Sequence, residues 1–92
     1  MKIPTKLKAL GMTIRVDRPD NVVVGADNCA GSWDSTNLVI EVKDGLPQDA
    51  AEVVFFHEIL HVADYNDALQ EDQVKQISRT LYALLKENGL LA

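Results

Sequence analysis

The pattern of apolar and polar residues changes halfway along the chain. Up to about residue 45, short β-branched runs are separated by turn residues, which predicts strands. The clearest runs are M-T-I-R-V at 12–16 and L-V-I-E-V at 38–42, and a further strand is predicted at about 30–33. Residues 34–37 predict a hairpin turn between the last two strands. The short apolar run 22–24 lies in a segment that otherwise has the composition of a loop.

The second half of the chain predicts two helices. Residues 49 to about 66 include no Gly or Pro, while Pro47 and Asp49 suit the start of a helix. The segment is apolar on nearly all sides, so this helix is expected to be central and buried. A second helix is predicted from about Gln70 to Asn88. On a helical wheel, its core-facing arc contains Val74, Ile77, Leu81, Leu84 and Leu85.

Strands followed by helices predict an α+β domain. We expect a small three-stranded antiparallel sheet packed on the central helix and the C-terminal helix. The whole sequence, residues 1–92, is expected to form a single domain. A short helix is also considered for the residues before Met12.

Composition narrows the classes of function. The 92 residues are 47% apolar and 25% charged, as in many globular domains. A net charge of −5 argues against nucleic-acid binding, because phosphate contacts need clustered Lys and Arg. No run has the length of a membrane span and the N-terminus has no apolar signal segment, so we expect no membrane association and a cytoplasmic location. The single cysteine, Cys29, is expected to be inert rather than a metal ligand.

The run H-E-I-L-H at 57–61 lies within the first predicted helix. Residues i and i+4 share one face of a helix, so His57 and His61 can bind one metal ion. Glu58 lies about 100° round the helix, close enough to that face to take a proton from a metal-bound water. Because H-E-x-x-H also occurs by chance, the motif can be interpreted only together with the sequence of the helix that contains it.

The alternative reading is a pair of core histidines that are satisfied by hydrogen bonds, with Glu58 as a partner. However, the polar groups of this helix form one narrow stripe on an otherwise apolar surface. Burial of imidazoles and carboxylates is costly unless they are paired or bind a metal. One zinc ion per chain is the simplest compensation.

A catalytic zinc site usually has three protein ligands, so a third is expected in addition to the two histidines. Glu71 lies at the edge of the core-facing arc of the second helix, whereas Asp72 faces away. Glu71 also has an ordinary explanation, because carboxylates are favourable in the first turn of a helix. Asp64 competes for the role, but it lies about 10 Å beyond His57 along a straight helix. It is better suited to accept a hydrogen bond from a ligating imidazole.

Several segments together support a resemblance to a known family. H-E-I-L-H-V-A-D, L-Q-E-D-Q-V, L-Y-A-L-L-K-E-N and the earlier G-S-W-D-S-T-N-L-V-I-E-V resemble the small phage and prophage zinc metallopeptidases related to the ImmA/IrrE-type proteins. The resemblance covers roughly residues 10–90, and only H-E-x-x-H is a sharp motif. It implies a zincin-like fold, zinc ligands at His57, His61 and Glu71, and a general base at Glu58.

These features predict a zinc-dependent peptidase that acts on a protein or peptide substrate. Zinc would activate a water molecule, and Glu58 would take its proton. Tyr65 and Tyr82 are considered as oxyanion donors or as structural tyrosines. The alternative function is a zinc-stabilised module that binds a partner protein without cleaving it. The sequence leaves the substrate and the oligomeric state open.

Overall fold

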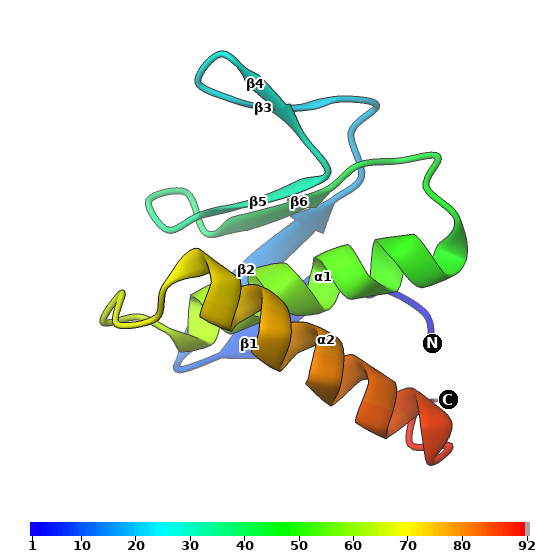
Figure 1. Ribbon diagram of the computed structural model, residues 1–92. Coiled ribbons are helices and arrows are strands. Elements are labelled where there is room, and N and C mark those ends of the chain that lie inside the picture. The colour runs from blue at the N-terminus through cyan, green and yellow to red at the C-terminus, as the bar shows by residue number, and fades with distance from the viewer. Residues whose placement is uncertain (92) are drawn as a thin grey trace.

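The computed structural model describes residues 1–91, which form an α+β fold with two helices, as predicted (Figure 1). Helix α1 packs against strands of a four-stranded sheet, and α2 packs on α1. Neither helix is long and apolar enough to cross a membrane. The strands are β1 (Lys6–Ala9), β2 (Met12–Asp17), β3 (Val22–Val24), β4 (Asp27–Cys29), β5 (Gly31–Asp34) and β6 (Val39–Val42), and the helices are α1 (Gln48–Ala63) and α2 (Glu71–Glu87).

The prediction of a three-stranded antiparallel sheet is wrong in strand number and in direction. The sheet has the order β1-β2-β6-β5, and its central pair, β2 and β6, runs parallel. After β2 the chain leaves this sheet and forms a separate antiparallel hairpin from β3 and β4 (Figure 1). It returns through β5, so that β6 comes to lie beside β2 in the same direction. β5 remains at one edge of the sheet, next to α1.

The short helix considered for the N-terminus is also wrong, because Lys6–Ala9 forms edge strand β1. Its side chains alternate between exposed and half-buried, which is the period of a strand. The turn to β2 consists of Leu10 and Gly11, which have φ values of 53° and 77°. Two-residue hairpins need such positive φ values. A leucine seldom adopts a positive φ. Of the two turn residues, only Gly11 therefore indicated a hairpin in the sequence.

Helix α1 occupies the centre of the molecule, as its apolar sequence predicts. One side of it covers the sheet, where Phe55 is 2% exposed. Side chains of β2, β6 and α1 form this core, namely Ile14, Val16, Ile40, Val42, Ala51, Phe55 and Val62.

Helix α2 presents a different face to α1 from the one that the wheel predicts. Three apolar residues expected in the core, Ile77, Leu81 and Leu84, are between 42 and 55% exposed. The buried residues of α2 are instead Val74, Ser78 and Tyr82.

A polar contact between the two helices explains this orientation of α2. The hydroxyl of Tyr82 donates to Oε1 of the buried Glu52 at 3.2 Å. The ring of Tyr82 also packs on Phe56, with 5.5 Å between ring centroids. A buried carboxylate needs a hydrogen-bond donor, and Tyr82 supplies one to Glu52. This contact favours burial of the Tyr82 face of α2 over the more hydrophobic face that contains Ile77, Leu81 and Leu84. In this orientation of α2 its first residue, Glu71, faces the histidines of α1.

Candidate metal centre

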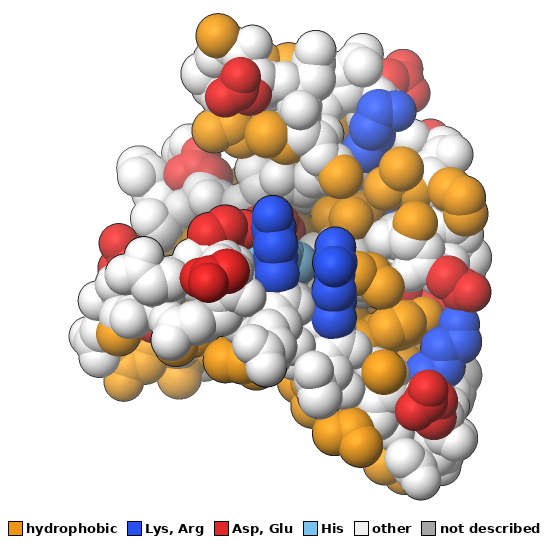
Figure 2. Space-filling model, in the orientation of Figure 1, with side chains coloured by type: hydrophobic (Ala, Val, Ile, Leu, Met, Phe, Trp, Pro, Cys, Tyr) orange, Lys and Arg blue, Asp and Glu red, His pale blue; other side chains and the backbone are white. Residues whose placement is uncertain are grey.

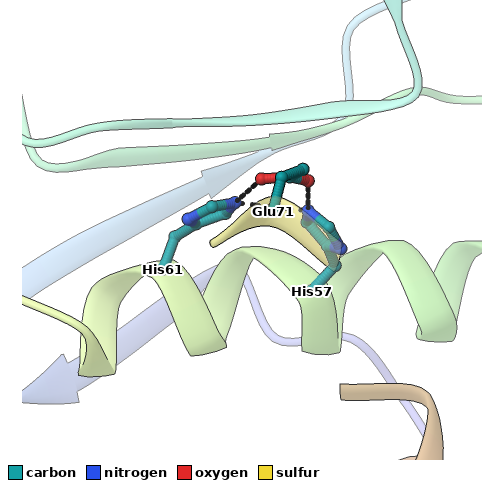
Figure 3. Close-up of side chains that lie close together, drawn as sticks. All are labelled: His57, His61 and Glu71. Atoms are coloured by element: carbon teal, nitrogen blue, oxygen red, sulfur yellow. Dashed lines mark hydrogen bonds and ion pairs between the residues drawn. The ribbon is translucent and has the colours of Figure 1, made fainter. Parts of the chain in front are cut away.

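Consecutive turns of α1 place His57 and His61 side by side, as their spacing predicts. Their ring centroids are 4.9 Å apart, and their Nε2 atoms are 3.2 Å apart. Both rings are half-buried on the side of α1 that faces the start of α2 (Figure 3). Two imidazole nitrogens therefore meet at one point beside the helix.

Glu71 completes this cluster from the first residue of α2 (Figure 3). Its Oε1 lies 2.7 Å from Nε2 of His57, and its Oε2 lies 3.3 Å from Nε2 of His61. The donor atoms of the three residues are all within 4.8 Å of one another. Zinc bonds of about 2.0–2.1 Å in tetrahedral geometry place the donors about 3.3 Å apart. The three donors therefore fit one zinc ion, with the fourth position left for another ligand.

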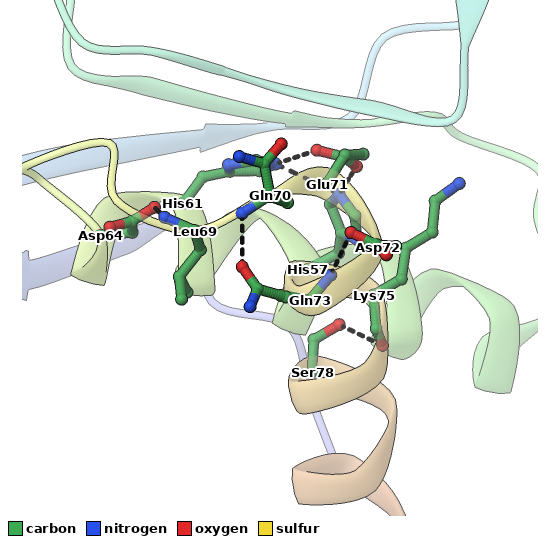
Figure 4. Close-up of polar contacts among 10 residues, drawn as sticks. All are labelled: His57, His61, Asp64, Leu69, Gln70, Glu71, Asp72, Gln73, Lys75 and Ser78. Carbon is green, nitrogen blue, oxygen red and sulfur yellow. Dashed lines mark hydrogen bonds and ion pairs between the residues drawn. The ribbon is translucent and has the colours of Figure 1, made fainter.

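Asp64 orders the loop that leads to Glu71. Its oxygens accept the backbone N–H groups of Ala68 at 2.9 Å and Leu69 at 3.0 Å (Figure 4). The expectation that Asp64 accepts a hydrogen bond from a ligating imidazole is therefore wrong. The backbone N–H groups of the loop after α1 need acceptors, and a short carboxylate side chain at the end of the helix can supply them.

The start of α2 is held by a second set of hydrogen bonds. Gln70 and Gln73 form a reciprocal capping box, in which the Gln70 backbone N–H donates to Oε1 of Gln73 at 2.7 Å (Figure 4). A capping box stabilises the start of a helix by giving acceptors to two backbone N–H groups that lack helical partners. Glu71 follows Gln70 directly, so its position is set by the loop before it and by the helix after it.

The electrostatic surroundings keep His57 in the form that binds metals. Burial lowers the pKa of His57, and the positive charges of His61 and Lys75 lower it further. The carboxylate of Glu71 acts in the opposite direction but does not outweigh burial. Because a metal binds the neutral imidazole, a lowered pKa makes His57 available as a ligand at neutral pH.

Glu58 is 6% exposed and lies next to His57 and Glu71, against the first residue of β5. Burial raises its pKa to about 7, and the nearby charge of Glu71 contributes to the shift. A carboxyl group that titrates near neutral pH can take a proton and return it under the same conditions. Glu58 therefore has the properties of a general base beside the three donors.

Gly31 is a residue of this site that sequence reasoning did not identify. A Cβ atom at this position would lie 2.5 Å from Cγ1 of Val54 and 3.1 Å from Oε2 of Glu58. The glycine thus allows β5 to approach α1 closely at the point where Glu58 lies. A glycine within a strand is a known sign of such close approach, and the strand predicted at about 30–33 contains Gly31. No local pattern showed that this strand lies against α1, so the signal could not be interpreted.

Two clefts adjoin the cluster, one next to each histidine. The first has a volume of about 410 Å³ and is lined by His57, Glu58 and Glu71 together with Lys75 and Arg79 of α2. The second has a volume of about 400 Å³, and its lining includes His61, Trp33, Leu38 and Tyr65.

The other candidates from the sequence lie at different distances from the cluster. Tyr65 is 73% exposed and lines the second cleft beside His61. Tyr82 lies eleven residues beyond Glu71, about 16 Å along α2, and donates to Glu52, so it is a structural tyrosine rather than an oxyanion donor. Cys29 lines the first cleft but is not among the clustered metal donors of residues 1–91.

Comparisons with models of protein families, with curated proteins and with solved structures found no match to this chain.

Proposed function

We propose that this protein is a zinc-dependent peptidase in which His57, His61 and Glu71 hold the metal and Glu58 is the general base. The observation that carries the proposal is the convergence of three zinc-type donors within 4.8 Å of one another. Three protein ligands and an open fourth position distinguish catalytic from structural zinc sites. Assignment to the small phage-type zinc metallopeptidases, with their zincin-like fold, belongs to the same proposal and is supported by the H-E-I-L-H motif.

A zinc ion held by His57, His61 and Glu71 would supply an acidified water and an electrophile for the carbonyl oxygen of a peptide bond. Glu58 accepts the proton of the attacking water and delivers it to the leaving amine. In the metal-free protein burial raises its pKa to about 7, and the charge of a bound zinc ion would lower this pKa and keep Glu58 ionised as a base. The buried position of Glu58 keeps bulk water from competing for the proton.

The edge of the sheet next to α1 supports a peptide as the substrate. β5 has one strand partner within the sheet, β6, so its other side is an edge. An extended peptide can pair with such an edge as an added strand. In that position it would pass the metal cluster and the two clefts beside it.

The test is a comparison of Glu58→Gln with the unchanged protein, both purified without a His tag. We expect Glu58→Gln to keep one zinc ion per chain and to lose at least about 100-fold of the turnover on denatured casein. Glu87→Gln, which makes the same change in an exposed residue at the end of α2, is the matched control. Equal turnover in the Glu58 variant would remove Glu58 from the mechanism.

The same experiment separates the two functions that the sequence left open. If the unchanged protein binds zinc but cleaves no denatured substrate, the non-catalytic module that binds a partner protein is favoured. If it binds no zinc, both metal-dependent functions are wrong. Chelator-treated samples provide the background for each measurement.

A further inference from the structure

We infer that Lys75 and Arg79 form an anion-binding wall beside the metal centre, and that this wall selects peptides with a carboxylate group on the His57 side of the site. The inference rests on the proposed function, since it names the substrate class of the same site. Both cations line the cleft that also contains His57, Glu58 and Glu71. They lie four residues apart, so they share one face of α2.

The two cations are not neutralised by the protein itself. Within residues 1–91 neither takes part in a salt bridge, although the chain has an excess of acidic residues. Lys86, the remaining cation of α2, is by contrast paired with Asp49. Two acids precede Lys75 by one turn: Glu71 has both oxygens directed at the histidines, and Asp72 accepts the backbone N–H of Gln73. Positive charge therefore remains available on this wall of the cleft.

The cations stand close to the reacting centre. Lys75 is near enough to His57 for its charge to lower the pKa of that imidazole. It extends from α2 on the side where Glu71 and His57 lie (Figure 4). On the surface, two basic side chains stand side by side in the middle of one face, with a small area of His visible behind them (Figure 2). A ligand that occupies the cleft beside His57 therefore meets Lys75 and Arg79.

The other charged side chains of the first cleft are Glu58, which is buried, and Glu71, whose oxygens are directed at the histidines. The wall formed by Cys29, Ala30 and Gly31 consists of small, uncharged residues. An extended peptide between this wall and α2 would direct an acidic group at Lys75 and Arg79. Such contacts between exposed charges are individually weak, but two of them together change affinity by about fivefold.

The cleft on the other side of the cluster has the opposite character. It combines Trp33, Leu38 and Tyr65 with the acidic residues Asp64 and Asp67. A carboxylate is repelled there, and an apolar side chain is favoured. The two clefts thus distinguish the two ends of a bound peptide, and the preference for an acid applies to one side only.

The test measures peptide binding rather than cleavage, so that it does not depend on turnover. The protein is the zinc-loaded, ¹⁵N-labelled Glu58→Gln variant, titrated in an NMR experiment with three alanine-based peptides. The first has blocked ends and one central glutamate, and the second has glutamine in its place. The third contains the glutamine but ends in a free carboxylate. We expect the first peptide to bind about fivefold more tightly than the second and to shift the backbone signals of Lys75 and Arg79.

Two double variants provide the comparison. Lys75→Gln with Arg79→Gln should abolish the difference between the glutamate and glutamine peptides. Lys6→Gln with Lys8→Gln removes the same charge from β1, at the far edge of the sheet, and should retain the difference. Tight binding of the third peptide would identify the chain end as the source of the carboxylate, and tight binding of the first alone would identify an acidic side chain.

Equal affinity for all three peptides, or no measurable binding of any of them, would overturn the inference. Neither result depends on hydrolysis. The proposed function fails separately, if the unchanged protein binds zinc but does not cleave denatured substrates.

Discussion

Oε1 of Glu71 lies 2.7 Å from Nε2 of His57, although the two residues belong to different helices. This contact joins the first residue of α2 to the middle of α1, and His61 lies within reach of the other oxygen. Without a metal, the cluster is a carboxylate shared by two imidazoles. In the proposed zinc-bound protein, the same three groups would be the ligands. The first prediction concerns the contribution of Glu71 to this site.

Glu71→Gln should weaken zinc binding by more than about 100-fold, because a neutral amide replaces an anionic ligand. Loss of a group that only supports a ligand already lowers metal affinity by about 10–100-fold, so loss of a ligand should have a larger effect. Competition with a fluorescent zinc chelator measures the change. Asp72→Asn removes the same charge from the next residue of α2 and should leave the affinity unchanged. If the two variants bind zinc equally well, Glu71 is not a ligand.

Asp64→Ala should reduce both stability and zinc affinity, although Asp64 is not expected to touch the metal. The variant loses the acceptors of the Ala68 and Leu69 N–H groups, which should cost about 1–2 kcal/mol in the free energy of unfolding. Zinc affinity should fall by about tenfold, because the loop no longer positions Glu71. Urea unfolding and chelator competition measure the two effects.

Asp67→Asn is the control for that variant. It removes a charge from the same loop, and asparagine tolerates the φ of 52° at this position. A loss of stability in Asp64→Ala with unchanged zinc affinity would show that the loop does not position the third donor.

Gly31→Ala should lower turnover while zinc remains bound. The added methyl group meets Cγ1 of Val54 at 2.5 Å, so β5 or α1 must move, at a cost of about 1–3 kcal/mol in unfolding free energy. The same methyl group lies against Glu58 and should displace the general base. Ala30→Ser, at the exposed neighbouring residue, is the control. Full activity and stability in Gly31→Ala would contradict the close approach of strand and helix.

The unfolding free energy of the zinc-free protein should contain a pH-dependent contribution from Glu58. Its pKa is about 7 in the folded protein and 4.5 as the ordinary value, so the folded state binds more protons between these pH values. Stability from this residue is therefore complete below pH 4.5 and falls as the pH rises to about 7. The total change is on the order of 3 kcal/mol.

Comparison with Glu58→Gln isolates this contribution, because the lowered pKa of His57 affects both proteins alike. Urea unfolding at a series of pH values should show the variant gaining stability relative to the unchanged protein as the pH rises. If the unfolding free energies of the two proteins change with pH in parallel, folding does not raise the pKa of Glu58, and the prediction is wrong.

The sequence by itself determined the α+β class, the two helices and the pairing of His57 with His61. These features depend on local rules, since a helix places residues four apart on one face whatever surrounds it. The apolar sequence of the first helix likewise required a central position. Glu71 was also selected from its place on a wheel, with Asp64 as a competitor, and the structure brings Glu71 to the histidines.

Only the tertiary structure decided how the sheet and the second helix are arranged around the site. The parallel pairing of β2 and β6 depends on a chain reversal through β3, β4 and β5, which no local pattern specifies. The rotation of α2 depends on the hydrogen bond between Tyr82 and Glu52, thirty residues apart, and this contact overrides the hydrophobic arc. Gly31 acquires its role only where β5 meets α1. Contacts between distant segments set these features, because burial and hydrogen bonding are satisfied by the whole fold rather than by each element alone.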